Sequence, residues 1–581
     1  MTDRAGVNYI NAMQFIPAFR PASAFALGLL GFGLLTVCAA AEPTAAGEKV
    51  SVEPFVPSGV FGDFLVGRFS AAQSDPNVAA EAFLRALADD PSNREVLQQA
   101  FVSCLLSGRS EATQLAERLP TDPVAQLLLA SQDARTGNWK GAIRRFGSLP
   151  GQGITQLLQP LLVAWAQVGA GQADVALATL RPFVEGERLR GMYALHAGMI
   201  ADLAGRQADA NYYYGIAQVE MPQISLRIAQ ILASWQARSG QPVAARRTLV
   251  AFADDAPDMA IAIPALQSGA GTRLIGRPTD GIAEAYLAIA GALRAEDSQE
   301  YAMLMLRLAL ELRPNLTAAR LLAADLLGTE SHAAAALQML ASVPANDPLS
   351  SVVRMRRADI LQHLGRTGEA VKELESIALA YPDSPLPPMQ EGDFLRAEHR
   401  YSDAIAAYTR AITLLRHPGT GDWPVFYDRG IAYEQEHQWP NAEADFRHAL
   451  QLAPDQPYVL NYLAYSWADR GQHLTEARAM LQKASQSRPN DGAITDSLGW
   501  VTLREGAIAD AVQLLERAVE LDPEDPTING HLGDAYAAAG RKMEAQYQWR
   551  RALTLNPAPD DMAKLEAKLQ APSSAPVVSG Q

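Results

Sequence analysis

Apolar residues recur every three to four positions through long stretches of this chain that are rich in alanine and leucine, which is the pattern of amphipathic helices. In the last third, four of these stretches end at Pro454, Pro489, Pro523 and Pro557, which are 35, 34 and 34 residues apart. No stretch shows the alternation of β-branched residues that indicates a run of strands. A period of about 34 residues predicts pairs of helices that stack on neighbouring pairs, because one pair cannot bury its own apolar face.

The clearest repeat begins near Pro526 and ends at Pro557. Small residues are expected where two antiparallel helices cross, since only a minimal side chain lets the backbones approach. In this repeat they are Gly533, Ala545 and Ala552. Large residues should fill the space between the crossings, and here they are Leu532, Tyr536 and Trp549. Gly540 is expected to end the first helix of the pair.

Three preceding repeats carry the same marks in the same register, at Gly499 and Ala511, at Ala464 and Ala477, and at Gly430 and Ala442. In these positions the chain resembles the tetratricopeptide repeat family. The resemblance implies an all-α fold of helix-turn-helix repeats stacked as a right-handed superhelical solenoid. Weaker repeats begin near Pro385, Ser351, Thr317, Ala283, Ser225, Arg190, Leu157, Pro123, Arg94 and Val60. An ordinary array of helical hairpins is the alternative for the upstream half.

The N-terminal segment predicts export. Ala24 to Val37 is largely apolar, and Cys38 to Ala41 follows it with small residues. We expect residues 1–41 to be a signal peptide cleaved after Ala41, or a membrane anchor if cleavage does not occur. Lipidation of Cys38 is a further alternative, although Val37 is large for the position before an acylated cysteine. A buried cytosolic helix is the remaining one. The protein is therefore expected in the periplasm or associated with the envelope.

Breaks in the helical pattern predict the domain boundaries. Residues 42–58 are rich in proline, alanine and small polar residues and are expected to form a flexible linker. Residues 59–254 form an N-terminal degenerate repeat array, and 255–281, rich in glycine and proline, a hinge. Residues 282–570 form a C-terminal array that ends in a capping helix carrying Leu565 and Leu569. Residues 571–581 are expected to be disordered.

Composition and motifs narrow the possible functions. The formal net charge is −15 and the basic residues are dispersed, so nucleic acid is an unfavourable partner. Cys104 lies in an apolar helical run and is expected to be a small buried residue. No catalytic, phosphate-binding or metal-binding motif is present, and the nine histidines are scattered. We therefore expect no enzymatic activity, no cofactor and no metal.

The resemblance places ligands in a concave groove lined by the first helix of each repeat. Polar and aromatic residues between the packing positions of the C-terminal repeats are the candidates for contacting a protein or peptide partner. They are Tyr427, Asp428, Asn461, Tyr462, Tyr465, Asp496, Trp500, Arg504 and Asp534. The alternative for Tyr462, Tyr465 and Trp500 is that they fill gaps between repeats. A basic clamp for a C-terminal carboxylate is not evident, because Arg504 stands alone among acidic residues.

A closer resemblance rests on three short runs, Leu460 to Tyr465, Asp496 to Trp500 and His531 to Asp534. They look like bacterial envelope tetratricopeptide proteins that include adaptors of periplasmic carboxyl-terminal processing proteases. This resemblance implies a non-catalytic scaffold that brings a protease to its cell-wall hydrolase substrates. One alternative is a component of polysaccharide synthesis or export machinery. Another is an enzyme of unrecognised fold in the upstream half, which would require strands there.

Overall fold

The structure is a computed structural model that describes residues 59–570 except 74, 188, 222–223, 295–297 and 329–331. The predicted signal segment, with Cys38 and Ala41, the linker 42–58 and the tail 571–581 lie outside the described residues. Every regular element in the described part of the chain is a helix. The all-α solenoid expected from the repeat pattern is confirmed, and the described part of the upstream half contains no strand.

The chain forms two compact units, with the division between Tyr381 and Pro382. We call the described residues before the division unit 1 and those after it unit 2. The helices of unit 1 are α1 (Val60–Ala72), α2 (Pro76–Asp89), α3 (Arg94–Ser107), α4 (Glu111–Glu117), α5 (Pro123–Arg135), α6 (Trp139–Gly147), α7 (Gly153–Gly169), α8 (Ala173–Glu185), α9 (Arg190–Leu203), α10 (Gln207–Glu220), α11 (Leu226–Arg238), α12 (Pro242–Asp255), the 3₁₀ helix η2 (Pro257–Ala262), α13 (Ile263–Gly269), α14 (Pro278–Arg294), α15 (Gln299–Leu312), α16 (Thr317–Leu326), α17 (Ala333–Ala341), α18 (Ser350–His363) and α19 (Thr367–Ala380). Those of unit 2 are α20 (Leu386–Ala397), α21 (Tyr401–Leu414), α22 (Trp423–Gln435), α23 (Trp439–Leu452), α24 (Pro457–Asp469), α25 (Leu474–Ser487), α26 (Gly492–Arg504), α27 (Ile508–Leu521), α28 (Pro526–Ala538), α29 (Lys542–Thr554) and α30 (Pro559–Gln570).

The ends of these helices follow from local sequence chemistry. Asp525 caps α28 by accepting hydrogen bonds from the backbone N–H groups of Thr527 and Ile528, at 2.7 and 2.9 Å, and Pro526 takes the first helical position. Gly540 separates α28 from α29 with a φ of 77°, a left-handed conformation that glycine adopts without strain. At the corresponding turn between α22 and α23, His437 takes this conformation with a φ of 58°.

Small residues stand at the helix crossings, as the repeat pattern predicts. A Cβ atom added to Gly533 would lie 2.5 Å from the indole of Trp549, and one added to Gly430 would lie 2.6 Å from the ring of Phe446. Ala545 and Ala552 are buried in the same pair of helices as Gly533. Gly540 ends the first helix of this pair, as expected. The expected capping helix is α30, which packs on α29 and buries Leu565.

The segment predicted as a hinge is mostly helical and lies within unit 1. It contains η2, α13 and the start of α14, and the compact units divide about a hundred residues later. The physical reason is that Ile261, Ile263 and Leu266 are buried, so the apolar residues between the glycines and prolines anchor this segment. The predicted boundary at 255–281 therefore differs from the division that the contacts within the structure give.

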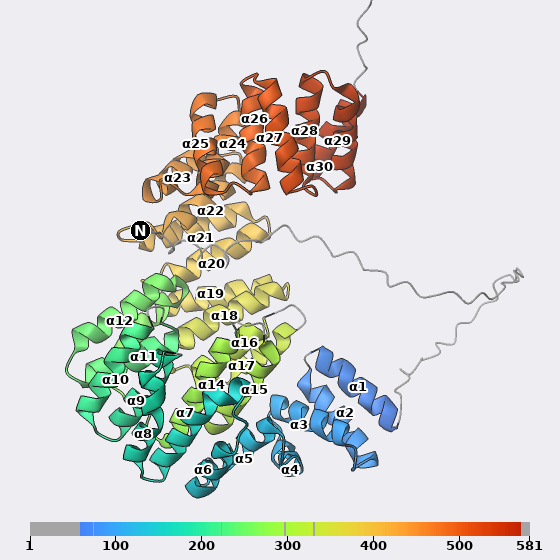
Figure 1. The fold of residues 1–581 in the computed structure, drawn as a ribbon. Coiled ribbons are helices and arrows are strands. Elements are labelled where there is room, and N and C mark those ends of the chain that lie inside the picture. The colour runs from blue at the N-terminus through green and yellow to red at the C-terminus, as the bar shows by residue number, and fades with distance from the viewer. Residues whose placement is uncertain are drawn as a thin grey trace, which may run out of the picture. The chain divides into compact units, whose positions relative to one another are not determined.

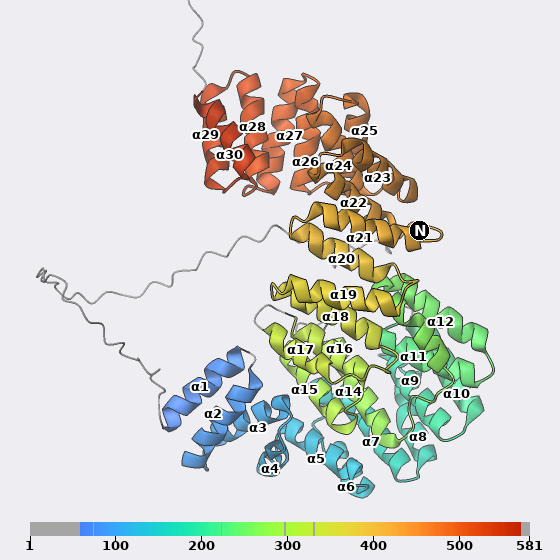
Figure 2. The same cartoon turned by 180° about the vertical axis from the view of Figure 1, so that it is seen from behind.

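Helix α14 lies against the first helices of the upstream repeats. Apart from its hairpin partner α15, it contacts α7 most extensively and also α5 and α9, and it stays beside α7 in both views (Figure 1 and Figure 2). A Cβ atom on Gly281 would lie 2.2 Å from the indole of Trp165, so this glycine permits the close approach. One apolar core runs from Ala79 to Met339 and includes α14. The upstream repeats are thus closed around a helix of their own chain.

No helix among the described residues combines the length and the apolar character that crossing a membrane requires.

Candidate functional site

The first helices of the repeats in unit 2 form one face, which we call the inner face. Helix α20 contacts α22, α24 contacts α26, and α26 contacts α28, while each second helix packs mainly on its own first helix and on the next one. The side chains that point away from the second helices on α20, α22, α24, α26 and α28 therefore share this face. All nine residues predicted as groove contacts lie on the last four of these helices.

Tyr427 and Tyr462 join neighbouring repeats. Their rings meet edge to face with centroids 5.7 Å apart, and the ring of Phe446 lies 5.9 Å from the first and 5.1 Å from the second. Burial raises the pKa of both phenols. These two tyrosines occupy the gap between repeats, which is the alternative role that the sequence left open for Tyr462 but not for Tyr427.

Asp428 belongs to a joint between α20 and α22. Its carboxylate lies 3.2 Å from the guanidinium of Arg396, and the nearby Asp393 accepts a hydrogen bond of 2.7 Å from the hydroxyl of Tyr408. Burial raises the pKa of Asp428 to about 7, Arg396 opposes this rise, and the neighbouring Asp393 adds to it. The structure therefore ties Asp428 to its own chain through an ion pair.

Asp496, Trp500 and His531 form a compact cluster between α26 and α28, which we call the histidine cluster. His531 Nδ1 lies 2.8 Å from Asp496 Oδ2, and the imidazole stacks on the indole of Trp500 with centroids 4.2 Å apart and planes 17° apart. Burial alone would lower the pKa of His531, but the carboxylate of Asp496 and its hydrogen bond raise the pKa above its usual value. Tyr465 on α24 borders the cluster, with its ring 6.0 Å from the imidazole.

Three buried polar atoms on the inner face have no hydrogen-bond partner among the described residues. They are Asn461 Oδ1, Asp496 Oδ1 and Trp500 Nε1. Asp496 is only 4% exposed. An unpaired buried donor or acceptor costs about 1–3 kcal/mol, so native structures contain few of them. All three atoms belong to residues that the sequence predicts as groove contacts.

The remaining predicted residues differ in how accessible they are. Arg504 is exposed, with its guanidinium 5.8 Å from the centre of the Trp500 ring and 3.4 Å from the backbone oxygen of Asp469. Both carboxylate oxygens of Asp534 are occupied, one by the indole N–H of Trp549 at 3.0 Å and the other by the ammonium of Lys568 at 2.7 Å. Arg504 can contact a ligand directly, whereas Asp534 holds the capping helix α30 on the last repeat.

His531 is the member of this site that sequence reasoning missed. The sequence places it inside a repeat helix, 31 residues after Trp500, with nothing to show that its ring reaches the preceding repeat. Asp496 and His531 are separated by 35 residues, one more than the period of 34 between these two repeats. A rule that pairs residues near the same position on neighbouring first helices would therefore have found it.

The corresponding face of unit 1 is filled by α14. Tyr286 is fully buried, its hydroxyl lies 2.9 Å from the hydroxyl of Ser131, and Glu284 accepts hydrogen bonds from Arg227 at 3.0 Å and from Arg313 at 3.2 Å. Trp165 donates its indole N–H to His196 Nδ1 at 2.9 Å, which requires that nitrogen to be unprotonated. Burial lowers the pKa of His196 to about 4. Tyr286, Glu284 and Trp165 are thus paired within the chain.

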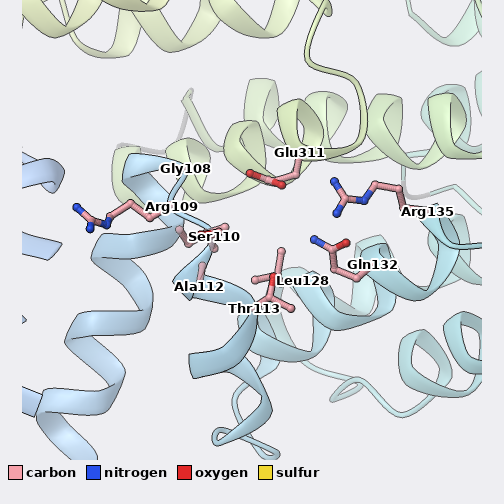
Figure 3. Close-up of a pocket in the computed structure, with 10 residues that line it drawn as sticks. Gly108, Arg109, Ser110, Ala112, Thr113, Leu128, Gln132, Arg135 and Glu311 are labelled. Atoms are coloured by element: carbon pink, nitrogen blue, oxygen red, sulfur yellow. The ribbon is translucent and has the colours of Figure 1, made fainter. Parts of the chain in front are cut away.

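Unit 1 also has a small pocket of about 250 Å³ between the α3–α4 turn, α5 and α15 (Figure 3). Arg135, Gln132 and Glu311 point toward the space between the lining residues, while the guanidinium of Arg109 turns away from it (Figure 3). Arg109 is held by Glu111 at 3.0 Å and by Glu81 at 3.6 Å. The lining mixes both charges in a space that suits one small molecule, and we assign no function to it.

Other chemistry is sparse in the described part of the chain. No three His, Cys, Asp or Glu side chains there come close enough together to hold a metal ion. Cys104 is buried, as the sequence predicts, and burial raises the pKa of its thiol to about 11. A thiol with a raised pKa is a poor nucleophile at neutral pH.

Comparison with known families finds tetratricopeptide repeats in two segments. Residues 280–420 match a tetratricopeptide repeat-like domain and residues 502–569 match a tetratricopeptide repeat. A TPR repeat-containing protein of Pseudomonas aeruginosa is 37% identical over 97 residues, which are 17% of this chain and 16% of that protein. Bacteriophage adsorption protein A of Escherichia coli is 32% identical over 80 residues, 14% of this chain and 8% of that protein. The matched regions thus span less than a fifth of the length of each relative.

Among solved structures, the chain is similar to Cut9 with Hcn1 from an APC/C hetero-tetramer, at 15% identity and a TM-score of 0.37, covering 87% of this chain and 95% of that one. It is also similar to yeast Tom70, at 13% identity and a TM-score of 0.32, covering 77% and 95%. YrrB, described as a TPR protein with an unusual peptide-binding site, is 20% identical with a TM-score of 0.27 and covers 34% of this chain and 98% of that one. Two segments of the chain, 280–420 and 502–569, therefore match tetratricopeptide repeat models, and neither matched family model indicates a catalytic family.

Proposed function

We propose that this tetratricopeptide repeat chain is a non-catalytic scaffold that binds a protein or peptide partner on the inner face of unit 2. The observation that carries the proposal is the group of unpartnered polar atoms on Asn461, Asp496 and Trp500. A polypeptide backbone supplies N–H donors and C=O acceptors in alternation. One extended segment can therefore satisfy the carboxamide oxygen of Asn461, the carboxylate oxygen of Asp496 and the indole N–H of Trp500, once these buried groups turn toward it.

The repeat places these groups in a regular order. Asn461 and Asp496 are 35 residues apart and hold the same position on α24 and α26, and Tyr465 and Trp500 follow each of them by one helical turn. The inner face therefore offers an acceptor and then an aromatic ring, twice in succession. A periodic ligand such as an extended chain fits this arrangement, and Tyr, Trp and Arg are the residue types that dominate interface energetics.

Charge further limits the partner. The pKa of Tyr465 is raised by burial first and then by the carboxylates of Asp469, Asp496 and Asp561, so several negative charges face this part of the inner face. Arg504 is the exposed base beside them. A partner segment that ends in a free carboxylate is disfavoured here, and a neutral or basic internal segment is favoured.

We further propose that the scaffold works in the periplasm or at the envelope, as an adaptor that brings a protease to cell-wall hydrolases. Support for the location comes from the apolar segment Ala24–Val37 and the small residues that follow it. Support for the adaptor role comes from the resemblance of the runs around Asn461, Asp496 and His531 to envelope adaptors of this kind.

A crosslinking pull-down of the tagged full-length chain from its native envelope tests both the binding of a partner on the inner face and the adaptor role. The inner-face variant carries Trp500→Ala and Arg504→Ala. The matched control carries Tyr547→Ala and Arg551→Ala, an aromatic and arginine pair with the same spacing on the exposed surface of α29. Partners captured by the unmodified chain and by the control but lost from the inner-face variant support the proposal. A protease or wall hydrolase among them supports the adaptor role.

Two outcomes count against it. Partners retained equally by all three chains would move the binding surface away from the inner face. Capture of polysaccharide synthesis or export components in place of proteases would contradict the adaptor role and favour the alternative that the sequence left open.

A further inference from the structure

Helix α1 carries three large apolar side chains that face outward. The residues it buries against α2 are Gly62, Gly67 and Ser70. The residues it exposes are Phe61 at 85%, Leu65 at 63% and Phe69 at 69%. The terminal helix of a repeat array normally presents a polar outer surface, because no further repeat covers it. An exposed apolar stripe at this end of unit 1 indicates that another surface packs on it.

The orientation of α1 is fixed by its contacts with α2. A Cβ atom on Gly67 would lie 2.7 Å from the ring of Phe83, so only glycine lets the helix sit this close. Phe64 packs edge to face on the same ring at 5.8 Å, and Asp63 pairs with Arg85 at 2.8 Å. The helix cannot roll to bury its stripe without breaking these contacts.

The stripe is symmetric about Leu65. Phe61 lies four residues before it and Phe69 four residues after it, which places all three on one side of the helix. If a second α1 packs antiparallel to the first across a two-fold axis through Leu65, each Phe61 meets Phe69 of the other copy and the two Leu65 side chains meet each other. A surface that matches itself in this way is what a two-fold interface requires.

Charge is sparse on the outward side of α1. Arg68 is exposed and makes no ion pair within the described residues. Asp63 does not face the stripe, because its carboxylate pairs with Arg85 on α2. Interfacial helices that lie on membranes carry Lys and Arg over their polar face, whereas α1 has Arg68 as its single basic residue. A second copy therefore fits this surface better than a lipid surface does.

We propose that α1 is a docking surface for a second copy of this chain, with the two α1 helices antiparallel across a two-fold axis at Leu65. A phenylalanine side chain offers up to about 150–250 Å² of area, so the stripe amounts to roughly 400 Å² per copy. The total of roughly 800 Å² lies below the 1,200–2,000 Å² of stable interfaces, so the dimer is weak and depends on concentration.

The test is sedimentation velocity of the full-length chain over a roughly hundredfold range of concentration. We expect a monomer–dimer equilibrium that Leu65→Glu shifts at least about tenfold toward monomer, since two carboxylates would meet on the axis. The matched control is Leu379→Glu, which changes a leucine that is 85% exposed on α19 and outside the stripe, and which should leave the equilibrium unchanged. Both leucines are exposed in the monomer, so neither variant is expected to unfold, and thermal melting checks this.

A Leu65→Cys variant tests whether the two-fold axis passes through this residue. Helices packed at the usual 8–10 Å between axes bring residues on a two-fold axis within disulfide reach, given a Cα radius of about 2.3 Å. Mild oxidation should link two copies of Leu65→Cys but not the unmodified chain, which retains its own cysteines. A chain that stays monomeric throughout overturns the proposal, as does equal weakening by both glutamate substitutions. Binding to liposomes that Leu65→Glu abolishes, without self-association, also overturns it and assigns the stripe to lipid.

Discussion

The face lined by the first helices of the repeats differs between the two units of this protein. In unit 1 the first helices of the repeats close around α14, and the polar groups that face it, such as Ser131 and Arg227, find partners on that helix. In unit 2 the equivalent inner face keeps Asp496 Oδ1 and Trp500 Nε1 without partners among the described residues. The comparison teaches that unit 1 satisfies such a face with a helix of its own chain, whereas in unit 2 these atoms are left for the partner that we propose.

The most damaging change should be one that removes the internal occupant of unit 1. Tyr286→Ala deletes a fully buried ring and leaves Ser131 without its hydroxyl partner, so we expect a loss of about 3–5 kcal/mol in the free energy of unfolding. Tyr301→Ala on the exposed side of α15 is the control and should change stability by less than about 0.5 kcal/mol. Urea unfolding followed by tryptophan fluorescence measures both, and a loss below about 1 kcal/mol for Tyr286→Ala would show that α14 is not integral to the unit.

A smaller loss is expected from overfilling a crossing in unit 2. Gly533→Ala forces a methyl group against Trp549, which costs about 1–3 kcal/mol because the helices must separate. Gly291→Ala is the control, since this helical glycine has open space around it and alanine should stabilise α14 by about 0.5–1 kcal/mol. Opposite signs in thermal melts would confirm that crossing geometry, and not helix propensity, decides the first result. Two losses of similar size would contradict it.

The units should also respond to pH in opposite directions. In unit 2 the pKa of Asp428 is raised to about 7 and that of His531 is raised above its usual value, so the folded state holds protons that the unfolded chain releases. The contribution of both groups is therefore present under mildly acidic conditions and lost as pH rises through their folded pKa values. In unit 1 the pKa of His196 is lowered to about 4, so its contribution is present above the unfolded pKa of about 6.5 and lost as pH falls toward 4.

Hydrogen exchange resolved by peptide, corrected for intrinsic rates, can follow the two units separately. Between about pH 8 and about pH 5 we expect protection to rise around α22 and α28 and to fall around α9. Asp428→Asn should flatten the response around α22, and His196→Gln the response around α9. A parallel response of both units, or one unaffected by these substitutions, would refute the assignment.

The smallest expected effect is a gain in stability at a turn. His437 holds a left-handed φ of 58° in the turn between α22 and α23. The next three repeats have glycine at this position, namely Gly471, Gly506 and Gly540, and the φ of Gly506 is 86°. His437→Gly should stabilise unit 2 by about 0.5–1 kcal/mol, because the steric cost of a side chain in this conformation exceeds the extra chain entropy of glycine. The reverse change, Gly506→His, should cost a similar amount in the same melting experiment. A loss on His437→Gly would mean that the imidazole makes a stabilising contact.

The repeat architecture was readable in the sequence because each mark has a local cause. Pro526 starts a helix, Gly540 ends one, and Gly533 permits a crossing, so their spacing reports the fold directly. The role of α14 was not readable, since its apolar pattern is that of any repeat helix and only tertiary contacts decide which face it fills. The segment 255–281 was predicted as a hinge for the same reason, because its glycines and prolines are visible in the sequence while the burial of Ile261 and Leu266 is not.

The candidate site was readable to a similar extent. Periodicity identifies which residues of α24 and α26 face inward, and Asn461, Asp496 and Trp500 do carry buried unpaired atoms there. It cannot distinguish residues that wait for a partner from those already engaged, such as Asp534 with Lys568 or Tyr427 with Tyr462. That distinction depends on contacts between repeats, which is also why His531 was missed. Whether the nine residues bind a partner stays a prediction that the inner-face variant tests.

The position of α14 in the chain also determines how long the upstream repeats of unit 1 must wait for this helix during synthesis. Ser131 and Tyr286 are 155 residues apart in the chain, so at 5–20 residues per second the surface around Ser131 waits roughly 8–30 s for its occupant to be made. During that interval the nascent repeats present an apolar surface that chaperones can hold. Unit 2 has no such delay, because each of its repeats can pack on the one before it as soon as both have emerged.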